Sequence, residues 1–528
     1  MNKQTKIYFL EGVPLDSSYK NSIYFLTREA QTNYFLGKAK FSMLDCTFQR
    51  QEQRIRVNRP VSDCYHINYL MWQNTSYSTK WFYAFVNRVE YINDGCTWIY
   101  FQIDALQTYH FNYKLGYCYV DRTHTVTDDI GDNLEPEPVQ TGEYLYSDYQ
   151  GALFGGLEEM AFLVMVLDLD TTGGLGNLYD GIFGAAQIKA FRPDDVSNIN
   201  VYLDSFSEKP DAVLAIYTCP MKLIGTIPDE GLTLPRTAKA KRLFSEPSFV
   251  NGTQKLDGYL PRNKKLYTYP YNFYYVSNAS GSSLTLRYEF FENNAVELEA
   301  SGTITMPVQM IVRPYHYKNT PVGTVQDEPE QYMNELVTLS SYPLCSWGSD
   351  TYKAWTAQNS LPMIGKLAQS GVSGALGASL LGANPAFGLA TMGMQALSNL
   401  TASYQASIQA DVSRGSISSA NVNVSTGSQN FYGGRMSITA EKAALIDGFF
   451  DRFGYAVNRF MEPVRNARKV WTYFKCSEVN LLPTTSGNLG IPSPYQDEIR
   501  NAYLSGVTWW KSGDQVGHYE LDNTVGGD

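Results

Sequence analysis

Acidic residues supply the pattern in this sequence that comes nearest to a metal-binding motif. The stretch LDLDTTGGLGNLYD (167–180) resembles the start of a calcium loop, with Asp168, Asp170, Thr172 and Gly173 spaced like its first ligands and its turn. Such a loop ends on a bidentate Glu, but Tyr179 stands at this position. The pattern therefore indicates a strand that ends in a turn, and we expect no metal there.

Other polar side chains lack the placement that catalysis needs. A glycosidase requires two carboxylates that face each other across a substrate, and neighbours in sequence do not show this. We therefore expect solvated charges at the adjacent pairs Asp128-Asp129, Glu158-Glu159 and Asp194-Asp195. The five histidines have no pair at metal-ligand spacing and are expected to be core or surface residues: His66, His110, His124, His316 and His518.

Motifs of the common enzyme classes are missing from the sequence. It has no Walker-type phosphate loop, no dinucleotide fingerprint and no G-x-S-x-G. The basic and aromatic run at 454–475 suits either a nucleic-acid backbone or an amphipathic strand whose Arg and Lys reach solvent. The sequence thus predicts no enzyme, no metal site and no cofactor.

Composition favours a mainly β (α+β) protein of several domains. The chain has 528 residues, 14% of them aromatic, with 39 Tyr, 42 Gly and 23 Pro, which is typical of strands and turns. Its net charge of −10 argues against a general nucleic-acid binder, but not against a surface past which DNA slides. The seven scattered cysteines indicate reduced thiols in a protein assembled in a cytosol, and the N-terminus shows no signal-peptide pattern.

Three elements are clear from local patterns. Two aromatic and β-branched runs within 80–104 flank Asn93-Asp94-Gly95, which predicts a tight hairpin with both faces buried or in an interface. The apolar run 160–170 predicts a buried strand. TAEKAALIDGFFDRF predicts a helix that Thr439 caps and Gly454 ends.

Shifts in composition divide the chain into five segments. They are a β-rich N-terminal domain (1–125), an acidic linker or loop (126–157), middle β/α accessory domains (158–345), an inserted apolar loop (346–430) and a C-terminal domain (431–528).

The inserted loop has a run without charge. Residues 367–410 contain no Asp, Glu, Lys or Arg, although 18% of the chain is charged. Asn384-Pro385 divides the run, which predicts two helical arms (361–383 and 386–402) of about 34 and 25 Å, near the ~30 Å of a bilayer core. Val372, Leu376 and Leu380 share one face of the first arm, and small residues at four-residue spacing that allow close helix packing lie opposite: Ser370, Gly374, Ala378 and Gly382.

This pattern leaves three interpretations open. They are a constitutive transmembrane span, an apolar hairpin or loop hidden in an oligomer, and a hidden loop that enters membranes conditionally. Glycines and interrupting polar residues disfavour the first. The side chains expected to form the loop's apolar surface are Leu361, Met363, Ile364, Val372, Leu376, Leu380, Leu381, Pro385, Phe387, Leu389, Met392, Met394 and Leu397.

Several separated stretches resemble one family, the tail knob or tail tube proteins of small podoviruses, short-tailed phages of Gram-positive hosts. SYKNSIYFLTREAQTNYFLGK is similar to the opening of that family, and KWFYAFVNRVEYINDGCTWIYFQIDALQTY resembles its most recognisable block. That block ends in an Ile-Asp-x-x-Gln-Thr signature at Ile103, Asp104, Gln107 and Thr108. FFDRFGYAVNRFMEPVRNARKVWTYFK and GVTWWKSGDQVGHY resemble the later blocks, with Trp510 where the family pattern has His.

The resemblance implies a virion protein, a hexameric tube of β-barrel-like domains at the tail tip. Segments 1–125 and 431–528 would form the tube wall, and the apolar loop would plug the lumen. On release the loop would enter the host membrane and give phage DNA a path, without sequence-specific binding. Other tail proteins, the host membrane and further copies of the chain are then the expected partners.

Two other functions stay open on the sequence alone. Aromatic β-domains also suit a receptor-binding adhesin that grips cell-wall glycans, although an adhesin needs no hidden hairpin. A wall-degrading hydrolase would need a facing carboxylate pair or a metal site.

Overall fold

Two compact units make up the chain in the computed structural model. Unit 1 comprises Met1–Gly142, Gly258–Leu266 and Thr439–Asp528, and unit 2 comprises Glu143–Asp257 and Tyr267–Ile438. The structure describes residues 5–44, 52–77, 79–150, 160–167, 186–192, 194–206, 213–234, 241–278, 282–303, 309–318, 337–339, 431–485 and 487–526.

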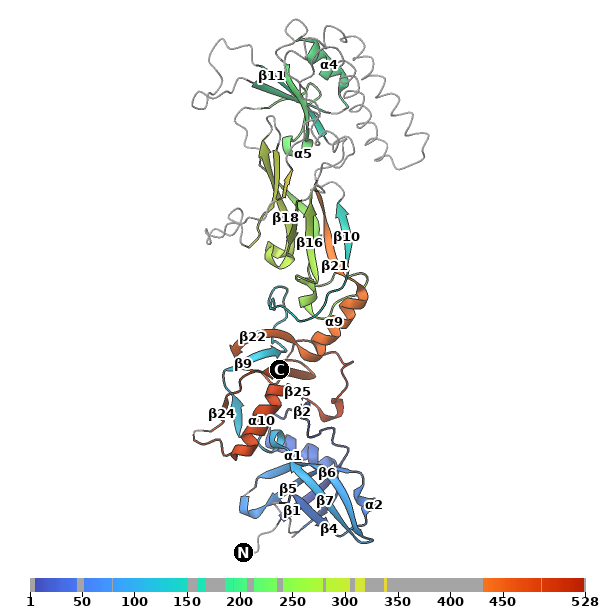
Figure 1. Ribbon diagram of the computed structural model, residues 1–528, viewed down its shortest axis with the longest axis vertical. Coiled ribbons are helices and arrows are strands. Elements are labelled where there is room, and N and C mark those ends of the chain that lie inside the picture. The colour runs from blue at the N-terminus through green and yellow to red at the C-terminus, as the bar shows by residue number, and fades with distance from the viewer. Residues whose placement is uncertain are drawn as a thin grey trace, which may run out of the picture. The chain divides into compact units, whose positions relative to one another are not determined.

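The N-terminal part of unit 1 is a six-stranded antiparallel sheet, drawn in blue and curled like part of a barrel wall in Figure 1. Its order is β3-β1-β5-β6-β7-β4, formed by Ala39–Met43, Thr5–Glu11, Ile67–Asn74, Trp81–Asn93, Cys96–Ile103 and Arg54–Val57. Asn93 pairs with Cys96, so Asp94 and Gly95 form the turn of the predicted hairpin.

Both faces of this sheet are buried along β5 and the first part of β6, whereas the end of β6 from Asn87 to Asn93 is largely exposed, so the burial predicted for the hairpin holds only in part. Neighbouring residues along a strand point to opposite faces. On β5, Leu70 and Trp72 therefore belong to one apolar core, and Tyr69 and Met71 to a second core.

The second sheet of unit 1 joins the two ends of the chain. Its order is β2-β25-β23-β9-β22, formed by Asn21–Ile23, Val507–Trp510, Trp471–Cys476, Cys118–Thr123 and Tyr455–Met461. The pairing of β2 with β25 is parallel. Strands β8 (Tyr113–Leu115) and β24 (Leu481–Pro483) form a separate two-stranded ladder. Helices α9 (Ala440–Phe453) and α10 (Ser493–Ser505) contact β23 of the second sheet. Helices α1 (Arg28–Gly37) and α2 (Val61–Cys64) contact strands of the first sheet.

The Ile-Asp-x-x-Gln-Thr signature ties the two sheets of unit 1 together. Asp104 caps α3 (Ala105–Thr108) by accepting the Gln107 N–H at 2.9 Å, and it also accepts the Tyr69 hydroxyl at 2.8 Å. The Gln107 amide donates to the carbonyl of Ile23 in β2 at 2.8 Å. Burial raises the pKa of Asp104 to about 7, because its charged form is poorly solvated there.

Over its described residues, unit 2 forms three four-stranded antiparallel sheets. The first, β10-β21-β16-β17, combines Tyr144–Gln150, Tyr432–Ile438, Asn272–Ser277 and Ser283–Leu286. The second, β13-β11-β12-β14, combines Val213–Pro220, Met160–Leu167, Ala186–Phe191 and Leu232–Thr233. The third, β15-β18-β19-β20, combines Lys241–Phe249, Ala295–Thr303, Gln309–Pro314 and Val337–Leu339.

The apolar run predicted to be a buried strand is therefore a strand, β11, over Met160–Leu167. Its Val164 and Val166 pack with Phe191 and with residues of α4 (Val196–Asp204) in a small core. The helix α5 (Met221–Ile224) follows β13.

The described residues confirm the mainly β fold class. They do not include the apolar loop, for which two helical arms were predicted. Residues 361–402, the expected calcium-like turn after Leu167, and Glu158-Glu159 lie outside the described ranges. Within those ranges no helix is long and apolar enough to cross a bilayer. The cysteines whose side chains the structure describes are free thiols, as predicted: Cys64, Cys96, Cys118 and Cys476.

Candidate functional site

A densely hydrogen-bonded polar site of unit 1 is formed by a short segment of chain that lies, in sequence, between two stretches of unit 2, called excursions. This segment, Gly258–Leu266, is called the strap here, because unit 2 residues precede and follow it in sequence. Helix α9 begins directly after the second excursion ends at Ile438. That second excursion, Tyr267–Ile438, includes the uncharged run of the sequence.

Helix α9 forms as the sequence predicted. The Thr439 side chain accepts the Lys442 N–H at 3.4 Å, and Gly454 ends the helix with a φ of 66°, which favours glycine. The buried positions follow helical spacing and are Ala443, Ile446, Asp447 and Phe450. A carboxylate on this apolar face needs hydrogen-bond partners, since an unpaired buried charge is strongly unfavourable.

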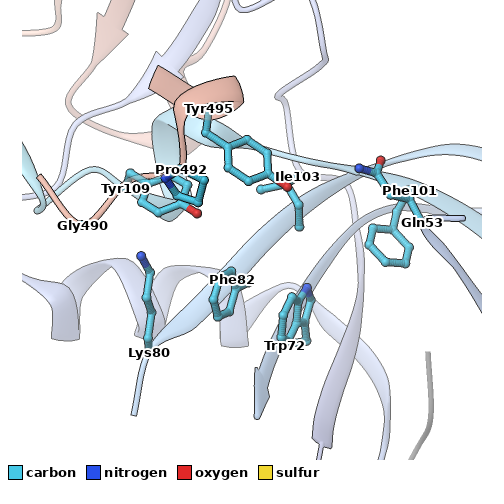
Figure 2. Close-up of a pocket in the computed structure, with 10 residues that line it drawn as sticks. All are labelled: Gln53, Trp72, Lys80, Phe82, Phe101, Ile103, Tyr109, Gly490, Pro492 and Tyr495. Atoms are coloured by element: carbon cyan, nitrogen blue, oxygen red, sulfur yellow. The ribbon is translucent and has the colours of Figure 1, made fainter. Parts of the chain in front are cut away.

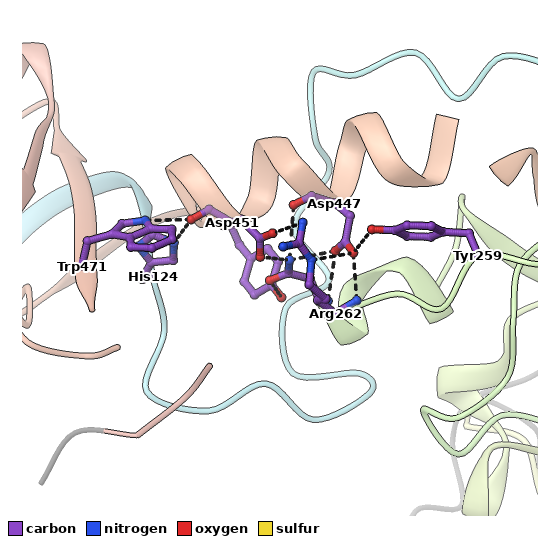
Figure 3. Close-up of polar contacts among 8 residues, drawn as sticks. His124, Tyr259, Arg262, Asp447, Asp451 and Trp471 are labelled. Carbon is purple, nitrogen blue, oxygen red and sulfur yellow. Dashed lines mark hydrogen bonds and ion pairs between the residues drawn. The ribbon is translucent and has the colours of Figure 1, made fainter. Parts of the chain in front are cut away.

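Asp447 finds those partners in the strap, as Figure 3 shows. Its fully buried carboxylate accepts the Tyr259 hydroxyl at 2.8 Å and the Arg262 N–H at 2.8 Å. It also accepts the Asn263 backbone N–H at 3.0 Å and the Asn263 side-chain amide at 2.8 Å. A carboxylate has about four acceptor positions, so this one is fully engaged.

Asp451 lies one turn further along the same face of α9 and also binds the strap. It accepts the Asn263 amide at 2.7 Å and forms an ion pair with the Arg262 guanidinium. Burial raises the pKa of the Asp451 carboxyl, although Asn263 and Arg262 both favour its charged form. Asp447, Asp451, Arg262 and Asn263 are together called the clasp.

The C-terminal end of α9 is held in turn by a histidine with a defined tautomer. The backbone carbonyl of Asp451 faces Nε2 of His124 at 2.9 Å and accepts the Trp471 indole N–H at 2.9 Å. His124 Nδ1 accepts the Tyr473 N–H at 2.8 Å, so the ring proton is on Nε2. Burial lowers the pKa of His124 to about 3, with Arg468 adding repulsion, and the ring is therefore neutral at pH 7.

A second group of charges holds the strap from its other end. The buried Glu137 carboxylate pairs with the Lys265 ammonium at 2.6 Å and with the Arg122 guanidinium. It also accepts the Ala456 N–H at 2.8 Å, and the Lys265 ammonium donates to the Glu135 carbonyl at 2.7 Å. Burial lowers the pKa of Lys265, while the charge of Glu137 opposes that shift.

One carboxylate pair expected to be solvated is only partly so. Asp129 is exposed, but Asp128 accepts the Tyr455 hydroxyl at 2.6 Å and the Lys264 N–H at 3.2 Å. Burial raises the pKa of Asp128. The expectation was wrong for Asp128 because folding brings the strap and β22 against it, which sequence neighbours do not reveal.

The arrangement is suited to fastening and not to proton transfer. The carboxylates of Asp447 and Glu137 each accept several donors from the protein itself, and that of Asp451 accepts the Asn263 amide and pairs with the Arg262 guanidinium. All three are thus committed to partners within the fold instead of facing a substrate. Over the described residues no group of three His, Cys, Asp or Glu is placed to hold a metal ion. The site thus joins the strap, α9 and the start of β22 within unit 1.

Comparison with known proteins gives this architecture a family. The family described as "Bacillus phage phi29, Tail knob protein gp9, C-terminal domain" matches residues 237–524, which is more than half of the chain. The chain belongs to this tail knob family. A second family, "Caudoviral major tail protein N-terminus", matches residues 3–114.

Individual tail knob proteins match over nearly the whole chain. The tail knob protein gp9 of Bacillus phage PZA is 24% identical, and that of Bacillus phage phi29 is 23% identical; each match covers 99% of this chain and 98% of the relative. The solved structure of the bacteriophage C1 tail knob protein gp12 has the same fold, with a TM-score of 0.64 at 14% identity over 99% of this chain and 100% of that one.

Membership of the tail knob family confirms the resemblance seen in the sequence. It places the chain in the virion as a structural component of the phage tail. The residues predicted to line the apolar loop, from Leu361 to Leu397, lie outside the described ranges and remain a prediction.

The clasp was missed by sequence reasoning, although one signal for it was present. Asp447 occupies a helical position between the apolar residues Ala443 and Phe450, where a solvated charge does not belong. A carboxylate at such a position predicts a buried polar partner. Nothing local identifies Arg262 and Asn263 as that partner, since they lie more than 180 residues away.

Proposed function

We propose that the chain forms a hexameric tube at the tip of a phage tail, with unit 1 in its wall. The apolar loop of residues 346–430 closes the lumen before infection, then leaves it and enters the host membrane so that DNA can pass. One observation carries this proposal: a tail knob protein contains 44 consecutive residues, 367–410, without a formal charge.

The physical argument concerns where such a run can be sheltered. A single soluble chain would expose a large apolar patch, which is unfavourable in water. Six copies around one lumen can bury their loops against each other. Lipid is an equally apolar second environment, because the run lacks the charges that would each cost about 2.5–3.5 kcal/mol at the bilayer centre.

The clasp supports this proposal by fastening the two ends of the excursion that contains the loop, while the loop itself follows β20 (Val337–Leu339) and precedes β21 (Tyr432–Ile438), which are strands of unit 2. The excursion Tyr267–Ile438 leaves unit 1 from the strap and returns into α9, and Asp447 joins those two elements. The net charge of −10 suits a conduit that DNA passes without binding tightly.

Dye release from liposomes tests the proposal. The intact chain is compared with a variant in which residues 361–410 are replaced by a short Gly/Ser linker, at neutral and mildly acidic pH. Light scattering establishes that both chains form the same oligomer. We expect leakage from the intact chain alone.

A single charge gives a sharper comparison. Leu380→Asp places a carboxylate in the middle of the uncharged run, and Ser425→Asp places one in the Ser/Asn-rich stretch after it. We expect the first to abolish leakage and the second to preserve it, because only the first charge must enter lipid. Equal leakage from all chains, or from none at either pH, would count against membrane entry. Binding of the purified protein to host cell walls would then favour a receptor-binding role.

A further inference from the structure

A cavity of about 200 Å³ opens in unit 1 beside the six-stranded sheet. Figure 2 shows Phe82 and Trp72 on one side of it and Tyr109 and Tyr495 on the other. Strands β5, β6 and β7, the residue after α3 and the start of α10 contribute its lining. The residues that line it are Gln53, Trp72, Lys80, Phe82, Phe101, Ile103, Tyr109, Gly490, Pro492 and Tyr495.

Lys80 brings a cation into this aromatic setting. Its ammonium lies 3.9 Å from the centre of the Tyr109 ring and 5.4 Å from that of Phe82. Burial lowers the pKa of Lys80 to about 8, and the nearby Arg28 acts in the same direction. No carboxylate in the described ranges forms an ion pair with it. The ring contacts only partly compensate for lost water, so an anion in the cavity would be favourable.

The size of the cavity restricts what can bind there. Sites for small-molecule ligands usually measure about 300–1,000 Å³. This smaller space is suited to one side chain, in the way that an anchor residue fills a pocket at a protein interface. The stacked rings of Trp72 and Phe82, 4.2 Å apart, offer a flat wall for methylene groups, and Lys80 offers the partner for a carboxylate.

We propose that this cavity receives an acidic side chain of a second copy of the chain, whose carboxylate pairs with Lys80. The chain itself is a source of such groups, with 52 acidic against 42 basic residues. The choice of a second copy as the occupant rests on the proposed function, in which copies lie side by side in a ring. The inference adds which residue accepts the neighbouring copy and through which chemistry.

Zero-length cross-linking identifies the occupant directly. Carbodiimide joins a lysine to a carboxylate only when the two are in contact, and the lowered pKa of Lys80 leaves much of its amine reactive near pH 8. An equal mixture of ¹⁴N- and ¹⁵N-labelled full-length chains is assembled, cross-linked and digested. We expect Lys80 to be joined to an Asp or Glu peptide, with the two isotopes combined in one product.

Two lysine variants test what the contact contributes to assembly. Lys80→Met keeps much of the side chain's length and removes its charge. Lys6→Met is the matched control, because Lys6 is exposed and its ammonium also lies over a tyrosine, 4.8 Å from the ring of Tyr8. In sedimentation experiments we expect Lys80→Met to weaken self-association about tenfold or more and Lys6→Met to leave it unchanged. The melting temperature of unassociated Lys80→Met should equal or exceed that of the wild type, since an unpaired, partly desolvated charge is removed.

The outcomes separate this inference from the proposed function. Cross-links of Lys80 confined to one isotope, or none at all, would overturn the inference, and so would equal association of Lys80→Met and wild type. A chain that stays monomeric at all concentrations would also overturn it. If the wild type releases dye and Lys80→Met self-associates as the wild type does, the inference about the cavity is rejected and the proposed function stands. A Lys80-dependent assembly that never releases dye would reject membrane entry alone.

Discussion

Replacing Asp447 by Ala tests whether the clasp holds the strap to α9. Four hydrogen-bond donors lose their acceptor in this variant, all of them from Tyr259, Arg262 and Asn263. Two of the four donors have another acceptor within reach. Tyr259 is half-buried, so its hydroxyl can turn to water, and the Asn263 amide still binds Asp451 at 2.7 Å.

The expected loss follows from the two donors that remain. The backbone N–H groups of Arg262 and Asn263 have no second acceptor, and each such group costs about 1–3 kcal/mol. We therefore expect Asp447→Ala to lower the free energy of unfolding of unit 1 by about 2–6 kcal/mol. Asp447→Asn should lose about half as much, because one oxygen stays as an acceptor while its amide faces the Arg262 N–H.

Hydrogen exchange is the decisive assay, since a chain of two units need not unfold in one step. In Asp447→Ala the amides of Arg262 and Asn263 should exchange faster than in the wild type. Chemical denaturation measures the accompanying loss of stability. Glu441→Gln is the control, because Glu441 is an exposed carboxylate on the same helix. Its effect should stay within about 0.5 kcal/mol.

Two results would refute this reasoning. Unchanged exchange at Arg262 and Asn263 in Asp447→Ala would show that the carboxylate does not hold the strap. An equal loss of stability in Glu441→Gln would assign the effect to the helix itself and not to the clasp.

Three further predictions concern unit 1. A strained positive φ alone costs about 1–3 kcal/mol, and Gly454→Ala should lower stability by more than this, because a Cβ there overlaps the backbone of Thr123. Thermal denaturation measures the loss, and a change below about 0.5 kcal/mol would contradict the prediction. Burial lowers the pKa of His124 from 6.5 to about 3, so it adds stability at neutral pH that is lost as the pH falls through that window; His124→Gln should flatten the acid side of the denaturation profile. Burial raises the pKa of Asp104 from 3.8 to about 7, so the stability that its protonated form contributes is lost as the pH rises through 7. In Asp104→Asn the free energy of unfolding should therefore fall less between pH 5 and pH 8 than in the wild type. An equal fall in both chains would contradict this.

Local patterns predicted the elements whose signals lie within a few residues. The turn at Asp94-Gly95 formed where it was expected, although neither residue has the positive φ that the Asp-Gly pattern suggested. The helix from Thr439 to Gly454 formed as expected, because capping side chains and a glycine with positive φ act over one to four residues. The aromatic pattern also predicted burial on both faces of the hairpin strands, which holds for the first part of β6 but not for its exposed end from Asn87 to Asn93.

The signature at Asp104 and Gln107 could be recognised from the sequence but not explained by it. Its role became clear only when Tyr69 and Ile23 were seen to bind it, from strands that belong to different sheets.

The sequence by itself determined that this is a mainly β tail protein with an uncharged insertion. Composition, motif spacing and family pattern can all be read from the residues along the chain without knowing which of them meet in space. Only the tertiary structure decided which polar groups act together. Asp447 binds residues some 185 positions away, and Lys80 lines a cavity with Tyr495 from the far end of the chain. Hydrogen bonds and ion pairs act over a few ångströms in space. The distance that matters for them is therefore set by folding and not by separation along the chain.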